Sequence, residues 1–132
     1  MGYIINNGIK YGASSGIDYI VEQGVSGIWT YRKWNSGLAE CWGTYEFQTA
    51  VNTAWGSIYE SGQIQFPNYP FTFTELPIVL YSHNASDNAY IIEGGDKRGT
   101  QTVAPPAFWI ARGVSTSSAT YKVSAHTIGK WK

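Results

Sequence analysis

The chain has 132 residues, which fits one domain, and its nine basic and nine acidic residues leave no net charge. The missing basic surplus argues against a nucleic-acid partner, and the balanced charge argues against an anionic membrane surface. Aromatic residues (16%) outnumber charged ones (14%), and there are 15 glycines. This composition predicts a β-rich fold with tight turns and excludes an intrinsically disordered chain.

The first 25 residues are predicted to form an arm and a connector. Residues 1–12 indicate a short hairpin or extended arm that turns at Asn6-Asn7-Gly8. Residues 13–16 (ASSG) are typical of a flexible joint, and residues 17–24 fit either a strand or one short helical turn. An isolated two-stranded piece is marginally stable. We therefore expect the arm to pack on its own domain or on another chain.

A β-hairpin is predicted over residues 28–47, where two alternating runs flank Asn35-Ser36-Gly37. In the first run, Trp29 and Tyr31 point to one face while Arg32 and Trp34 point to the other. In the second run, one face carries Ala39, Cys41, Gly43, Tyr45 and Phe47, and the opposite face carries Leu38, Glu40, Trp42, Thr44 and Glu46. We expect Tyr31, Trp34 or Trp42, and the last strand around Val123, to contribute to the core.

The remaining pattern predicts several short strands, and residues 26–132 are expected to form one all-β, antiparallel β-sandwich. Fewer than about one residue in ten should be helical. The predicted strands span residues 58–66, 76–83, 89–93, 107–113 and 120–132, with a polar connection at 48–57, a proline-containing bend at 66–71, loops at 84–88 and 94–106, and a turn at 114–119.

The chain offers few residues in the patterns that catalysis needs. Cys41 is the only cysteine, lies in a strand-like run, and is interpreted as a small buried apolar residue. His83 and His126 are far apart and lack metal-ligand spacing, and no Gly-x-Ser-x-Gly motif occurs. We therefore expect no enzyme activity, no metal and no cofactor.

Recognition is the function that the composition favours, because sugars stack on aromatic rings and need amide or carboxylate partners for their hydroxyls. The candidate loops are 84–88, 94–106 and 113–119. The predicted ligand-binding residues are Asn84, Asp87, Asn88, Tyr90, Asp96 and Arg98.

Three ordered motifs between residues 26 and 132 resemble a C-terminal domain of bacteriophage and prophage tail-fibre or minor structural proteins. These motifs are GIWTYRKWNSGLAECWGTYEF, IQFPNYPFTFTELPIVLYS and the closing YKVSAHTIGKWK. The segment YIINNGIKYG is similar to the short arm of small structural proteins in phages of Gram-positive bacteria.

The resemblance implies an H-type-lectin-like β-sandwich that assembles as a homotrimer at a fibre tip, with other tail proteins as neighbours. It also implies assembly in the host cytoplasm, residence in the virion tail, and action at the bacterial surface on a cell-wall glycan. One departure concerns the loop before the last strand, GVSTSSA, which lacks the ring and histidine that H-type lectins place there. The alternatives are a purely structural tail or baseplate protein and a wall-degrading enzyme.

Overall fold

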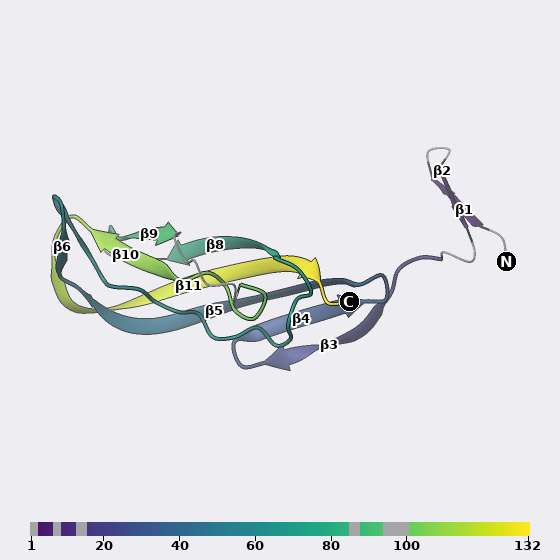
Figure 1. Ribbon diagram of the computed structural model, residues 1–132, viewed down its shortest axis with the longest axis horizontal. Coiled ribbons are helices and arrows are strands. Elements are labelled where there is room, and N and C mark those ends of the chain that lie inside the picture. The colour runs from purple at the N-terminus through teal and green to yellow at the C-terminus, as the bar shows by residue number, and fades with distance from the viewer. Residues whose placement is uncertain (1–2, 7–8, 13–15, 85–87, 94–100) are drawn as a thin grey trace.

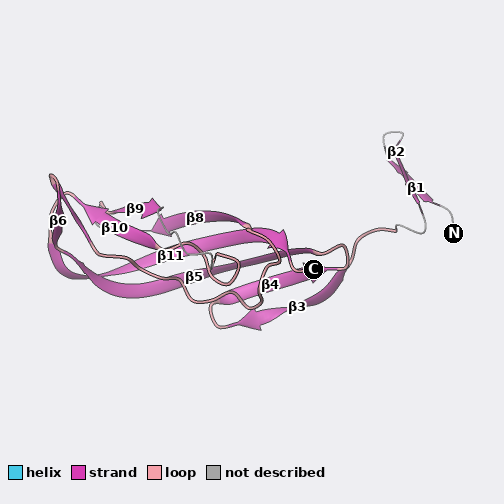
Figure 2. Cartoon of the chain, in the orientation of Figure 1, coloured by secondary structure: helices cyan, strands magenta, loops and turns pink. Residues whose placement is uncertain are grey.

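The computed structural model describes residues 3–6, 9–12, 16–84, 88–93 and 101–132. Within these residues every regular element is a strand and none is a helix (Figures 1 and 2). The strands are β1 (Tyr3–Asn6), β2 (Ile9–Gly12), β3 (Ile20–Ser26), β4 (Trp29–Trp34), β5 (Leu38–Val51), β6 (Thr53–Trp55), β7 (Ile58–Glu60), β8 (Ile78–Asn84), β9 (Tyr90–Glu93), β10 (Phe108–Arg112) and β11 (Thr116–Lys130).

The described strands form three antiparallel sheets. The hairpin β1–β2 is a two-stranded sheet of its own. The main body packs a five-stranded sheet, in the order β3-β4-β5-β11-β8, against a four-stranded sheet, in the order β6-β7-β10-β9. The predicted all-β sandwich is therefore confirmed.

The pair formed by β5 and β11 runs the length of the body. Its register extends from Leu38 opposite Lys130 to Val51 opposite Thr116, with one irregularity near the Thr116 end. Successive side chains point to opposite faces of a strand, so the pair supplies both the core and an outer surface. The predicted alternation is confirmed, because the buried positions are Ala39, Cys41 and Val51 on β5 and Tyr121, Val123, Ala125 and Thr127 on β11.

Two predicted connections are instead parts of strands. Residues 48–51, expected to be polar linker, continue β5 because Gln48 and Thr49 pair with Thr120 and Ala119 of β11. The expected turn at 114–119 is shorter, because β11 already begins at Thr116. Long-range pairing thus extends both strands through polar sequence that has no local strand signal.

The second layer of the core has two parts. The four-stranded sheet contributes Phe108, whose ring centroid lies 5.7 Å from that of Phe47 on β5. The irregular segment at 61–77 contributes Phe66, which lies 5.7 Å from Tyr45 and 5.4 Å from Phe108. Such aromatic pairs stabilise a core beyond the effect of buried area alone.

Trp29 is the fully buried tryptophan of the hairpin, with 1% of its surface exposed. Its ring packs against Phe66 and Tyr69, and its indole N–H donates to the Asn68 carbonyl at 2.7 Å. Val123, predicted to be in the core, is buried. Trp42 is only half-buried, because its position in β5 points to the opposite face.

The turn at Asn35-Ser36-Gly37 joins three parts of the chain at one end of the body. The Asn35 N–H donates to the Tyr19 carbonyl and the Trp131 N–H donates to the Gly37 carbonyl, each at 2.9 Å. Gly37 has φ +100°, and a Cβ there would lie 2.9 Å from the Lys132 carbonyl oxygen. The turn therefore requires glycine on both conformational and steric grounds.

Replacing Trp29 by Ala should lower the free energy of unfolding by about 3–5 kcal/mol, because it opens a cavity and removes a buried hydrogen bond. Urea denaturation followed by circular dichroism measures this. The matched control is Trp55→Ala, since the Trp55 side chain is exposed. Equal losses in the two variants would contradict the placement of Trp29 in the core.

Candidate functional site

The outer face of the five-stranded sheet carries the most distinctive arrangement of side chains. One cross-strand row runs from Leu80 on β8 through His126 and Trp42 to Thr30 and Val25 on β3. Directly paired residues of antiparallel strands point to the same side, so these five side chains share the face. Aliphatic residues lie at the two edges of the row, and polar and aromatic residues lie at its centre.

A second row lies next to the first, with aliphatic residues on its β8 and β11 side and polar or charged residues on the rest. It runs from Ile78 through Ile128, Glu40 and Arg32 to Gln23. Leu80, Ile78 and Val25 have 62%, 68% and 75% of their surface exposed. The edge strands therefore present branched apolar side chains to solvent, a surface that monomeric proteins usually keep small.

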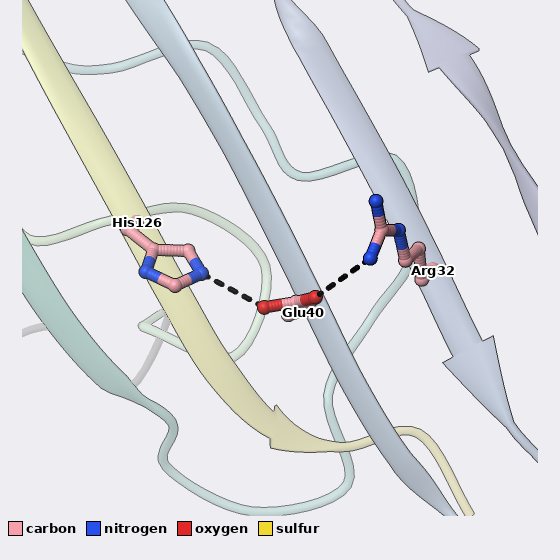
Figure 3. A network of polar contacts seen from close by, with 3 residues as sticks. All are labelled: Arg32, Glu40 and His126. Atoms are coloured by element: carbon pink, nitrogen blue, oxygen red, sulfur yellow. Dashed lines mark hydrogen bonds and ion pairs between the residues drawn. The ribbon is translucent and has the colours of Figure 1, made fainter.

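The centre of the face is an interacting set of Arg32, Glu40, Trp42 and His126. Figure 3 shows the polar contacts that join Arg32, Glu40 and His126. His126 Nε2 lies 2.9 Å from Glu40 Oε2, and an Arg32 guanidinium nitrogen lies 3.9 Å from Glu40 Oε1. The Arg32 guanidinium carbon lies 5.2 Å from the centre of the Trp42 ring, a cation–π distance. The His126 ring meets the Trp42 ring edge-on at 6.1 Å.

A shallow hollow of about 270 Å³ lies beside this set of residues. Its lining includes Trp42, Leu80 and His126, together with residues that carry hydroxyl groups. The hydroxyls of Thr44 and Ser124 are hydrogen-bonded across the β5–β11 pair at 2.7 Å. The arrangement offers apolar contact with a few hydrogen-bonding groups, which is the chemistry of a binding surface.

The buried polar groups lie on the other side of the same sheet. Burial raises the pKa of the Cys41 thiol to about 12, and burial also raises the pKa of the Tyr69 hydroxyl. Thr127 Oγ1 donates to the Tyr69 hydroxyl oxygen at 3.3 Å. A thiol with a raised pKa is a weak nucleophile, so this group is interpreted as part of the core.

The ligand-binding residues predicted from the sequence fall around the β8–β9 connection, as far as the structure describes them. Asn84 ends β8, Asn88 precedes β9 with φ 55°, and Tyr90 begins β9 with an exposed ring. Asp87, Asp96 and Arg98 lie outside the described residues.

Sequence reasoning did not single out the set around Trp42. The alternation in the hairpin already put Glu40 and Trp42 on one face, which was the available signal. The missing information was the pairing of Trp42 with His126, 84 positions further along the chain (126 − 42).

Among the described residues, no cluster of His, Cys, Asp and Glu is arranged to hold a metal ion. Over the same part of the chain, no helix has the length and apolar character that crossing a membrane requires. In comparisons with known proteins, the chain matches no family model, no curated protein and no solved structure.

Native Cys41 should react with a thiol reagent at pH 8 at least tenfold more slowly than the urea-unfolded chain, because only the thiolate is nucleophilic. The raised pKa also makes the protein less stable as the pH rises above the thiol's ordinary value, since the unfolded chain then releases a proton that the native chain retains. Spectrophotometric thiol titration measures the rate. Equal rates in the native and unfolded chains would show that Cys41 is accessible.

Proposed function

We propose that the chain is a non-catalytic protein of a bacteriophage or prophage tail tip. It assembles as a homotrimer through the outer face of the five-stranded sheet and recognises carbohydrate on the cell wall of a Gram-positive host. Other tail proteins are its neighbours in the virion. The three sequence motifs of the tail-fibre resemblance support the identity of the assembly, and the surface of the sheet supports the mode of association.

The single observation that supports the proposed association is the exposure of Ile78, Leu80 and Val25 on one sheet face. Fully burying a side chain of this kind stabilises an association by about 1.5–3 kcal/mol. Specific interfaces bury roughly 800 Å² per partner, which sets the area that this face has to bury in a stable trimer. A second copy of the chain offers the same aliphatic edges and is a chemically matched partner.

The polar centre of the face is compatible with burial between copies. The Glu40 carboxylate contacts both Arg32 and His126, so its charge is already compensated within the chain. Paired charges cost less to remove from water than isolated ones. The zero net charge of the chain also gives little long-range repulsion between copies.

Leu80→Glu should convert the trimer into a single chain, because it puts a carboxylate in an apolar interface. Size exclusion with light scattering should give about three times 14.6 kDa for the unmodified protein and about 14.6 kDa for the variant. The matched control is Val114→Glu, because Val114 is a similarly exposed apolar residue in the turn between β10 and β11.

Two results would contradict this assignment. A mass near that of one chain for the unmodified protein at micromolar concentration would exclude the trimer. If the Leu80→Glu variant is still a trimer, the trimer interface lies on another surface of the chain.

The protein should sediment with purified Gram-positive cell walls without releasing soluble fragments from them. Combining Asp87→Ala with Asp96→Ala should weaken this binding about tenfold or more, because each lost charged hydrogen bond contributes about 1.5–3 kcal/mol. Quantitative pull-down and a reducing-sugar assay measure the two effects. Unchanged binding by the double variant would exclude these aspartates from the binding site. If the unmodified protein does not bind walls, a purely structural role is favoured. Release of soluble fragments would identify a hydrolase.

A further inference from the structure

The outer face of the four-stranded sheet points away from the proposed trimer interface. Its register places Tyr90, Ala111, Glu60 and Thr53 in one row across β9, β10, β7 and β6. Paired residues of antiparallel strands share a face, so Tyr90 and Glu60 point to the same side of this sheet.

The neighbouring rows add two tryptophans to this face. Trp109 pairs with Ile92 one row beyond Tyr90, and Trp55 pairs with Ile58 at the opposite edge. On each strand, the residue named here lies two positions from the first-row residue of the same strand. Side chains two positions apart on a strand point to the same side, so all of these residues share one face. Three aromatic side chains, from β6, β9 and β10, thus lie on one face; we call Trp55, Tyr90 and Trp109 the aromatic face.

Burial in the core does not account for two of these rings, because Tyr90 and Trp55 are largely exposed. Tyr90 has 67% and Trp55 has 53% of its surface exposed. Trp55 is the most exposed of the chain's six tryptophans, all of which lie in the part of the chain that the structure describes. It lies in a three-residue edge strand whose side chains are all exposed, so it is not held there by the core.

We propose that the aromatic face binds an uncharged oligosaccharide of the cell wall; this inference rests on the carbohydrate recognition proposed above. Rings present flat apolar surfaces that match the C–H faces of sugars. Among the described residues of the face, Glu60 is the only charged one, and it can accept hydrogen bonds from sugar hydroxyls. Its negative charge disfavours an anionic polymer.

The outer face of the five-stranded sheet carries a different kind of exposed apolar side chain, which is why a protein partner is proposed there and a glycan here. There the exposed apolar side chains are aliphatic and branched, which suits another protein surface, whereas here the most exposed apolar side chains are the rings of Tyr90 and Trp55. Strands about 4.8 Å apart separate β9 from β6 by about 14 Å, so the aromatic face is wider than one sugar ring. A chain of several sugars is therefore the expected ligand.

The first test uses an array of neutral and anionic oligosaccharides with the intact protein. Binding should be confined to neutral glycans. With the best neutral glycan of the array as a soluble probe, Trp55→Ala and Tyr90→Ala should each weaken binding about tenfold. The control Tyr19→Ala removes a similarly exposed ring away from this face and should bind as the unmodified protein does.

A second measurement tests whether the bound glycan covers Trp55. The glycan probe should protect Trp55 from oxidation by N-bromosuccinimide, measured by mass spectrometry of peptides. Circular dichroism of each variant should be unchanged, which separates lost binding from lost folding.

Several outcomes would overturn the proposal. These are full glycan binding by both variants, an array response confined to anionic glycans, no response on the array, or wall binding that protease treatment of the wall abolishes. If the protein still binds cell walls in any of these cases, the proposed host recognition is kept but uses another surface. If the protein does not bind cell walls at all, the proposed host recognition is itself wrong.

Discussion

The pairing of β5 with β11 is the constraint on which the rest of the structure depends. Thirteen residue pairs join these strands across the middle of the five-stranded sheet. Their inward side chains form the floor of the aromatic core, and their outward side chains place Glu40, Trp42 and His126 together. A shift of one residue in this register would exchange the two faces, exposing the buried side chains and burying the charged ones.

The sandwich has two outer surfaces of different chemistry, and this difference suggests a division of labour. The five-stranded sheet presents aliphatic edges around an internally paired polar centre, as expected of a surface covered by another subunit. The four-stranded sheet presents aromatic residues, as expected of a surface that contacts sugars. In a trimer built through the first surface, three copies of the second would face outward, so that weak individual contacts could act together.

Local sequence patterns were sufficient for the all-β fold and for the facing of most strands. The hairpin at Asn35-Ser36-Gly37 and the buried positions of the last strand follow from alternation and turn chemistry alone. The extension of β5 to Val51 and the set around Trp42 could not be predicted, because both depend on pairing with residues far along the chain. The aromatic face was missed for the same reason: Trp55 and Tyr90 come from opposite edges of one sheet, and nothing local relates them.

The direction of the long strands has a mechanical consequence. The turn at residues 35–37 binds residues 19 and 131 at one end of the body, while β6 lies at the other, and β5 and β11 run between these ends (Figure 1). Hydrogen bonds between antiparallel strands are perpendicular to the strands. A force pulling the two ends apart would therefore load the β5–β11 bonds in shear, many at once, instead of unzipping them singly. The fold is suited to bearing tension along its length, whatever molecules are attached at its two ends.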